Sequence, residues 1–123
     1  MKYRRLGASG LCVSEIALGS WLTLGGSVDA AASERIARHA FDLGVNLFDS
    51  ADAYSGGEAE RALGRALAGL PRTRLVLATK CFFPMSDDPN DRGLSRKHVF
   101  ESVEGLFRRR GTDYLDLHQC HRA

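Results

Sequence analysis

The fold is decided by the stretch AASERIARHAFDLGVNLFD, which covers residues 31–49. Its first part carries Ile36, Ala40 and Leu43 at helical spacing, which predicts a helix with these three side chains buried. Its second part, Val45–Asp49, is a short apolar run that predicts a buried strand. A helix that leads directly into a buried strand is typical of α/β proteins with parallel strands.

The same alternation continues on both sides of this stretch. The other predicted elements are a hairpin over 3–13, strands over 16–19, 75–80 and 114–121, and helices over 58–68 and from the Ser95 cap to the Gly111 cap. The whole chain therefore reads as a hairpin followed by four strands that alternate with three helices. We find no internal repeat and no linker, so residues 1–123 are predicted to belong to one domain.

Both later helices carry an apolar stripe that predicts their buried face. The stripes comprise Ala59, Leu63, Ala66 and Leu67 in the first of them, and Val99, Val103 and Leu106 in the second. The run Arg108–Arg110 lies in the last turn of the second, where positive charge is favoured by the helix dipole. We interpret this run as a solvated helix end.

Charge and composition exclude several classes of protein. The chain has 17 lysines and arginines against 15 acidic residues, and a net charge of +2 is too weak to indicate a nucleic-acid-binding protein. No apolar run approaches the roughly 20 residues of a membrane span, and no signal-peptide core follows the basic start. The three cysteines, Cys12, Cys81 and Cys120, are odd in number and irregularly spaced, which favours unpaired thiols in the cytoplasm.

Chemically active side chains stand at the carboxyl ends of the predicted strands, where parallel α/β proteins bind their ligands. Asp49 ends one strand and Tyr54 follows it, Lys80 ends the next strand, and His121 ends the last. Singly, each has an ordinary explanation, such as a helix cap, a solvated lysine or a loop aromatic. Together they predict a site in which a lysine, held by a carboxylate, makes the tyrosine a better proton donor to a carbonyl bound by the imidazole.

The histidines and cysteines near the C-terminus also suggest a metal site. Strand alternation argues against it, because it places His118 and Cys120 on one face and His121 on the other. There is also no second cysteine pair at zinc spacing. We therefore predict no metal, an inward-facing His121, and a structural role for His118 and Cys120.

Three segments closely resemble the aldo-keto reductase superfamily: residues 44–54 (GVNLFDSADAY), residues 78–80 (ATK) and residues 114–122 (YLDLHQCHR). The start of the chain and residues 91–98 (DRGLSRKH) resemble one branch of it, which includes the potassium-channel β-subunits and their bacterial oxidoreductase relatives. The channel subunits usually carry asparagine where this chain has His121. That difference favours the enzymatic relatives.

The resemblance implies a (β/α)8 TIM barrel that binds NADPH and reduces aldehydes and ketones, with a small carbonyl compound as substrate. Tyr54 is implied as the general acid, with Lys80 and Asp49 tuning it, and His121 as the group that orients the carbonyl. The cofactor-binding residues implied are Gly19, Ser20, Trp21 and Asp49.

A complete barrel of this type has about 250 residues, so the sequence predicts the N-terminal hairpin, the first four strands and the first three helices of one. We expect such a half-barrel to be inactive by itself. Two alternatives stay open. One is an NADPH-binding redox sensor like the channel β-subunits. The other is a half-barrel without catalysis that pairs with a second copy as a homo-oligomer.

Overall fold

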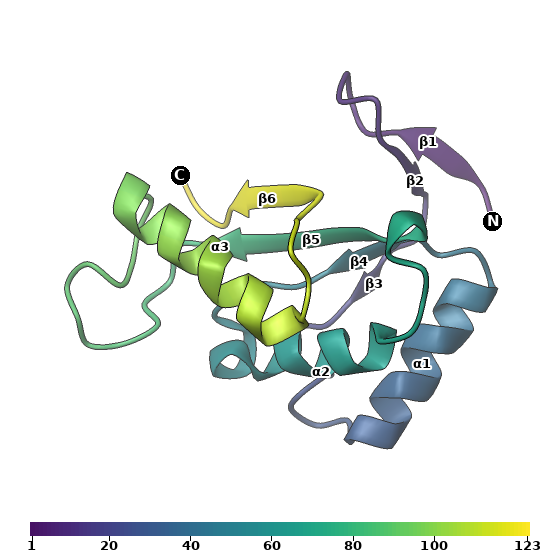
Figure 1. The fold of residues 1–123 in the computed structure, drawn as a ribbon, viewed down its shortest axis with the longest axis horizontal. Coiled ribbons are helices and arrows are strands. Elements are labelled where there is room, and N and C mark those ends of the chain that lie inside the picture. Colours follow the sequence, from purple (N-terminus) through teal and green to yellow (C-terminus); the bar gives the residue numbers. More distant parts are fainter.

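The computed structural model describes residues 1–123 and confirms the predicted alternation of strands and helices (Figure 1). The strands are β1 (Tyr3–Arg5), β2 (Cys12–Ser14), β3 (Leu18–Gly19), β4 (Leu47–Asp49), β5 (Val76–Cys81) and β6 (Leu117–Cys120). The α-helices are α1 (Ala30–Asp42), α2 (Glu58–Leu67) and α3 (Arg96–Arg110), and short 3-10 turns lie at Tyr54–Gly57 and Arg72–Arg74. No helix combines the length and the apolar character that a membrane crossing requires.

The main sheet has the strand order β3-β4-β5-β6, and each neighbouring pair is parallel. Each strand therefore lies beside its predecessor, as expected for successive βα units. The register pairs Gly19 with Asp49, Asp49 with Ala78, and Lys80 with Gln119. The carboxyl ends of all four strands consequently meet along one edge of the sheet.

The hydrophobic core lies between the sheet and helices α1 and α2. Phe48 and Leu77 enter it from the sheet, Leu63 enters it from α2, and each is almost completely buried. The predicted stripe of α2 is confirmed, because Ala59, Leu63, Ala66 and Leu67 are all buried. The helix-facing side of the sheet is therefore buried in the core, and strand-end residues such as Asp49 and Lys80 point to the opposite side.

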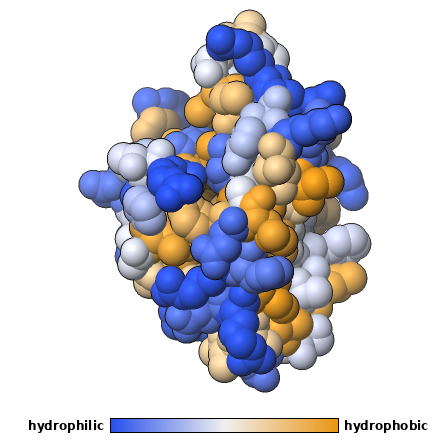
Figure 2. Space-filling view, turned by 90° about the vertical axis from the view of Figure 1, so that its right-hand side faces the viewer, coloured by the Kyte–Doolittle hydropathy of each residue, from blue (hydrophilic) through white to orange (hydrophobic).

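The predicted buried face of α1 is only partly right, because Ala40 packs against the core but the other two predicted residues are exposed. Ile36 and Leu43 are 42% and 59% exposed, whereas Ser33 and Ala37 are buried. Short side chains let the helix approach its neighbours closely, and α1 packs mainly against α2. On this side of the molecule, Figure 2 shows apolar side chains at the surface among polar ones.

The N-terminal hairpin formed by β1 and β2 is fastened to the loop that precedes β4. The Asn46 side chain accepts a hydrogen bond from the Ser14 N–H at 2.8 Å and donates one to the Cys12 carbonyl at 3.0 Å. The Tyr3 hydroxyl donates to the Gly44 carbonyl at 2.7 Å. Gly44 has a φ of 94°, and a Cβ there would lie 2.8 Å from the Tyr3 hydroxyl oxygen, so both its conformation and its surroundings require glycine.

Helix α3 begins and ends as predicted, but its basic end is not a solvated face. The Ser95 side chain caps its first turn, and Gly111, at a φ of 66°, ends it. Of the three arginines only Arg108 is exposed. Arg109 donates to the fully buried Glu60 at 2.5 Å, and Arg110 is only 6% exposed. A carboxylate buried on α2 requires a cationic partner, and helix α3 supplies it.

The apolar stripe predicted for α3 is only partly right. Leu106 is buried, but Val99 and Val103 are half-buried. The most buried positions include the polar residues His98, Ser102 and Arg110. This helix therefore packs against α2, the loop after β4 and strand β5 partly through polar contacts, which hydrophobic periodicity does not detect.

Candidate active site

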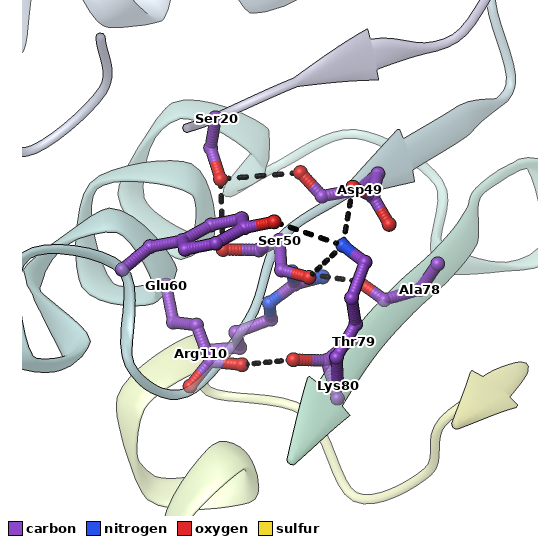
Figure 3. A network of polar contacts seen from close by, with 9 residues as sticks. Ser20, Asp49, Ser50, Glu60, Ala78, Thr79, Lys80 and Arg110 are labelled. Atoms are coloured by element: carbon purple, nitrogen blue, oxygen red, sulfur yellow. Dashed lines mark hydrogen bonds and ion pairs between the residues drawn. The ribbon is translucent and has the colours of Figure 1, made fainter. Parts of the chain in front are cut away.

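Lys80 lies at the centre of the polar cluster at the carboxyl edge of the sheet (Figure 3). Its Nζ donates to the Asp49 carboxylate at 2.6 Å and to the Ser50 carbonyl at 2.8 Å. It also donates to the Tyr54 hydroxyl at 3.3 Å. The ammonium group is therefore held by an anion and a carbonyl and touches the phenol oxygen, which is the contact predicted from the strand ends.

Neighbouring strands bring these groups together. Asp49 is paired with Ala78, so Lys80, two residues further along β5, points to the same face of the sheet. The chain after β4 continues along the edge of β5, where the Ser50 and Asp52 N–H groups donate to the carbonyls of Ala78 and Lys80. The ion pair is thus set by strand register and needs no long loop to position it.

A tight turn directs Tyr54 back over the sheet edge. Ser55, Gly56 and Gly57 all have positive φ, at 50°, 60° and 92°. At Gly57 a Cβ would lie 2.9 Å from the side chain of Arg109, so glycine also permits the close approach of α3. Ser55 is not a glycine, and its strained conformation lies directly beside the candidate proton donor.

The loop that carries Tyr54 is anchored to α3 by a buried carboxylate. Asp52 is 1% exposed and accepts a hydrogen bond from the Ser102 hydroxyl at 2.9 Å. Burial raises the pKa of Asp52, and the bond from Ser102 opposes that rise. This contact ties the turn to a helix and so restricts its movement.

His121 faces Tyr54 across a small aromatic cavity. The rings of Tyr54 and His121 have centroids 5.6 Å apart and meet edge to face, and the Phe83 ring lies 4.8 Å from that of His121. Trp21 lies beside Tyr54, with centroids 6.2 Å apart and planes inclined by 29°. The cavity has a volume of about 400 Å³ and is lined by Trp21, Ala53, Tyr54, Phe83, His121 and Arg122.

The imidazole of His121 is kept neutral by its surroundings. Burial lowers its pKa below the ordinary value of 6.5, and the positive charges of Lys80 and Arg122 lower it further. Its Nδ1 is buried without a hydrogen-bond partner. His118 lies on the opposite face of β6 together with Cys120, as alternation predicts, and burial lowers its pKa as well. No group of three or more His, Cys, Asp or Glu side chains is placed to hold a metal ion.

The three residues predicted at the end of the first strand occupy different positions. Trp21 is 64% exposed and forms one wall of the cavity, and Gly19 is exposed at the end of β3. Ser20 is 1% exposed, and its hydroxyl bonds to the Asp49 carbonyl at 3.1 Å and to the Ser50 hydroxyl at 2.8 Å. In this structure Ser20 stabilises the carboxyl end of β4, and its hydroxyl already has hydrogen-bond partners within the protein.

Sequence reasoning missed four members of the site, which are Ser50, Ala53, Phe83 and Arg122. Ser50 contacts Lys80 through its backbone carbonyl, which no residue pattern reveals. Phe83 and Arg122 line the cavity because each follows a strand that already carries a predicted site residue. Their positions, three residues after Lys80 and one after His121, were the available signal.

Comparison with known proteins confirms the family that the sequence resembles. Residues 15–123 match the Aldo/keto reductase family. The chain belongs to this family. Its members share the (β/α)8 barrel, of which the parallel sheet and helices described above form the N-terminal part.

The family's potassium-channel branch contains similar proteins. The chain is 41% identical over 124 aligned residues to a "probable voltage-gated potassium channel subunit beta" of Oryza sativa subsp. japonica and to one of Arabidopsis thaliana. It is also 41% identical to a "putative voltage-gated potassium channel subunit beta" of Schizosaccharomyces pombe. These alignments cover 98–99% of this chain but only 36–38% of each relative's length.

Proposed function

We propose that residues 1–123 supply the proton-donating site of an NADPH-dependent aldehyde and ketone reductase that acts in the cytoplasm. The observation that carries the proposal is the contact of one ammonium group, Lys80, with both the Asp49 carboxylate and the Tyr54 hydroxyl. Reduction of a carbonyl needs a proton on the oxygen as the hydride reaches the carbon. The tyrosine hydroxyl is the candidate donor.

Each side chain has a distinct part in this proposal. Lys80 stabilises the phenolate that Tyr54 becomes after giving up its proton, since a nearby cation favours the charged form of an acid. Asp49 keeps the ammonium oriented toward the tyrosine. Neutral His121, 5.6 Å from the tyrosine ring by centroids, is placed to donate a hydrogen bond to the same carbonyl oxygen.

The residues around the cavity suit a nicotinamide cofactor and a small carbonyl compound. Trp21 and Tyr54 lie beside each other as flat walls, and an exposed indole offers a surface on which a planar ring can lie. The unpaired Nδ1 of His121 is a polar atom without a partner in the protein itself. When bound, NADPH supplies the hydride.

The relatives extend well beyond the matched region, because the alignments cover at most 38% of their length. We propose that turnover needs the barrel elements that the relatives have in that remaining part, and that residues 1–123 by themselves do not turn over. Fusing residues 1–123 to the remainder of the Oryza sativa relative tests this directly. The fusion is expected to oxidise NADPH when benzaldehyde is added, and the 123-residue chain is not.

The tyrosine is tested in the same fusion by a matched pair of variants. Tyr54→Phe is expected to lower kcat by about 10²–10⁴-fold, the range for loss of a general acid. Tyr114→Phe removes a hydroxyl from a tyrosine that is 42% exposed and stacked under Arg72, away from the site, and should leave kcat unchanged. A folded fusion that reduces benzaldehyde equally well with Tyr54→Phe would contradict the proposal.

A second candidate function is suggested by the names of the relatives, which are potassium-channel β-subunits. In that case the fusion binds NADPH and associates with a channel but reduces carbonyl compounds slowly or not at all. The two candidates differ in their dependence on His121. Replacing His121 with Asn is expected to impair a reductase and to leave cofactor and channel binding by an accessory subunit intact.

A further inference from the structure

Two cysteines lie side by side at the ends of neighbouring strands. Cys81 ends β5, Cys120 ends β6, and the strand register pairs them directly. Register partners in a parallel sheet point to the same side. Adjacent strands lie about 4.8 Å apart, within the Cα separation of about 4.4–6.8 Å that disulfides span.

The two thiols differ in their access to solvent. Cys120 is exposed, whereas Cys81 is 1% exposed. Burial raises the pKa of the Cys81 thiol, and the neighbouring carboxylate of Asp52 raises it further. Because the thiolate is the reactive form of cysteine, Cys120 is the thiol that meets an oxidant first. Cys81 is then protected from solvent but stands next to any product formed on Cys120.

Both cysteines adjoin residues of the candidate active site. Lys80 precedes Cys81, and His121 follows Cys120. The His121 N–H also donates to the Cys81 carbonyl at 3.1 Å, so the two strand ends are already joined at this point. A covalent bond between the sulfur atoms fixes the relative position of the strands that carry Lys80 and His121.

We propose that Cys81 and Cys120 form a reversible intramolecular disulfide when the protein meets a hydroperoxide. The Cys120 thiolate attacks one oxygen of hydrogen peroxide, the O–O bond breaks, and Cys120 becomes a sulfenic acid. The other oxygen leaves as hydroxide, which becomes water by taking up the proton that the Cys120 thiol released when it ionised. The Cys81 sulfur then attacks the Cys120 sulfur, and the sulfenic hydroxyl leaves with the Cys81 proton as a second water. The two thiols together lose two protons and two electrons, and these reduce one hydrogen peroxide to two waters.

The bond is expected to be labile. Directly paired strand positions hold their Cβ atoms close to the strand spacing, whereas a disulfide prefers about 3.5–4.5 Å between them. The strands must therefore approach slightly, and strained disulfides are the more easily reduced ones. Dithiothreitol should restore both thiols.

The variant Cys12→Ser isolates the pair for the test. Cys12 is an exposed cysteine of the N-terminal hairpin, and its removal leaves only Cys81 and Cys120. The purified 123-residue chain with this change is treated with hydrogen peroxide and analysed by intact mass, thiol titration and non-reducing peptide mapping. The expected product is a monomer that has lost two hydrogen atoms, has no reactive thiol when unfolded, and yields one peptide pair joined through Cys81 and Cys120.

Three outcomes overturn the proposal. They are oxygen accumulating on Cys120 while Cys81 stays a thiol, a disulfide between two chains, and two thiols that survive peroxide unchanged. The matched variant Cys12→Ser/Cys81→Ser is expected to give either oxygen accumulating on Cys120 or a disulfide between two chains, because Cys120 then lacks its neighbour.

An effect on carbonyl reduction rests on the proposed function, but the disulfide itself does not. In the fusion with Cys12→Ser, oxidation is expected to lower kcat and dithiothreitol to restore it. The mass and thiol measurements on the 123-residue chain need no activity. A failed reductase assay with a detected disulfide therefore counts against the function alone.

Discussion

The two faces of β5 carry different kinds of polar network. On the face toward the strand-end site, Lys80 contacts Asp49 and Tyr54 and remains partly accessible, at 16% side-chain exposure. On the opposite face, Thr79 donates at 2.5 Å to Glu60 (Figure 3). Glu60 is fully buried and is also paired with Arg109. Adjacent residues of one strand thus serve two networks.

The difference between these networks is their solvent access. A buried ion pair that loses one partner leaves a charge in a medium of low polarity, which is costly to stability. A partly exposed pair that loses one partner is rehydrated, so its loss affects chemistry more than folding. The network around Glu60 should therefore govern stability, and the network around Lys80 should govern activity.

The largest effect is expected from Lys80→Met in the fusion with the Oryza sativa relative. This change removes the cation that contacts Tyr54, so kcat should fall by about 10²–10⁴-fold. The free energy of unfolding should change by only about 1 kcal/mol, because Asp49 remains 32% exposed and is rehydrated. Measuring kcat and urea unfolding on the same sample separates the effect on catalysis from the effect on stability. If Lys80→Met lost activity because the protein unfolded, the Lys80 network would govern stability as the Glu60 network does, and the two faces of β5 would not differ.

Next in size is Glu60→Gln, which should lower the free energy of unfolding by about 3–5 kcal/mol because it leaves the Arg109 charge without its partner. The matched control is Glu58→Gln. Glu58 is paired with Arg61 at 2.7 Å on the exposed side of the same helix, so this change should cost no more than about 1 kcal/mol. Urea unfolding of the 123-residue chain measures both. Equal losses in the free energy of unfolding for the two variants would show that burial does not determine how much stability is lost with an ion pair.

A smaller effect of opposite sign is expected from Arg110→Met. Burial lowers the pKa of Arg110 to about 10, so the guanidinium is still charged at neutral pH, and its Nε and Nη1 have no partner. Its one bond is to the Ala78 carbonyl, which also accepts from the Ser50 N–H. Replacing it with an apolar side chain should stabilise the fold by about 1–4 kcal/mol.

The exposed arginine of the same helix end provides the control for this variant. Arg108→Met should leave the unfolding free energy within about 0.5 kcal/mol. If Arg110→Met destabilised the chain instead, the buried guanidinium would have to be counted among the stabilising groups of the core.

The smallest effect concerns the protonation of His121. Its pKa is lowered from 6.5 in the folded chain, so the unfolded state takes up the proton first, and stability is lost as the pH falls below 6.5. Lys80→Met removes one cause of that lowering, so the imidazole should titrate closer to 6.5, which NMR can follow. Lys2→Met, at the exposed N-terminus, should leave it unchanged. A titration unaffected by Lys80→Met would place the ammonium too far away to act on the imidazole.

Local patterns predicted the architecture because they depend on neighbours in sequence. The Ser95 cap, the helix end at Gly111 and the stripe of α2 around Leu63 each follow from a few adjacent residues. The contact of Lys80 with Asp49 was also foreseeable, because parallel strands place their ends along one edge.

The failures share a different physical origin, since they depend on contacts between distant segments. Ile36 looks like a core residue, but α1 packs through the small side chain of Ala37. In the sequence, Arg109 and Arg110 resemble a solvated helix end. In the structure, Arg109 pairs with the buried carboxylate of Glu60, which lies 49 residues earlier in the chain. Neither the ion pair between Arg109 and Glu60 nor the burial of Ala37 in place of Ile36 can be predicted from a local sequence pattern.

The central claim is that Tyr54 and Lys80 act as one unit, and the double variant tests it most directly. In the fusion, kcat for benzaldehyde reduction is measured for Tyr54→Phe, Lys80→Met and both changes together. If Lys80 works through the tyrosine hydroxyl, the double variant is no slower than the slower single variant. If the two losses multiply, the residues act independently, and the contact at 3.3 Å is not the basis of the chemistry.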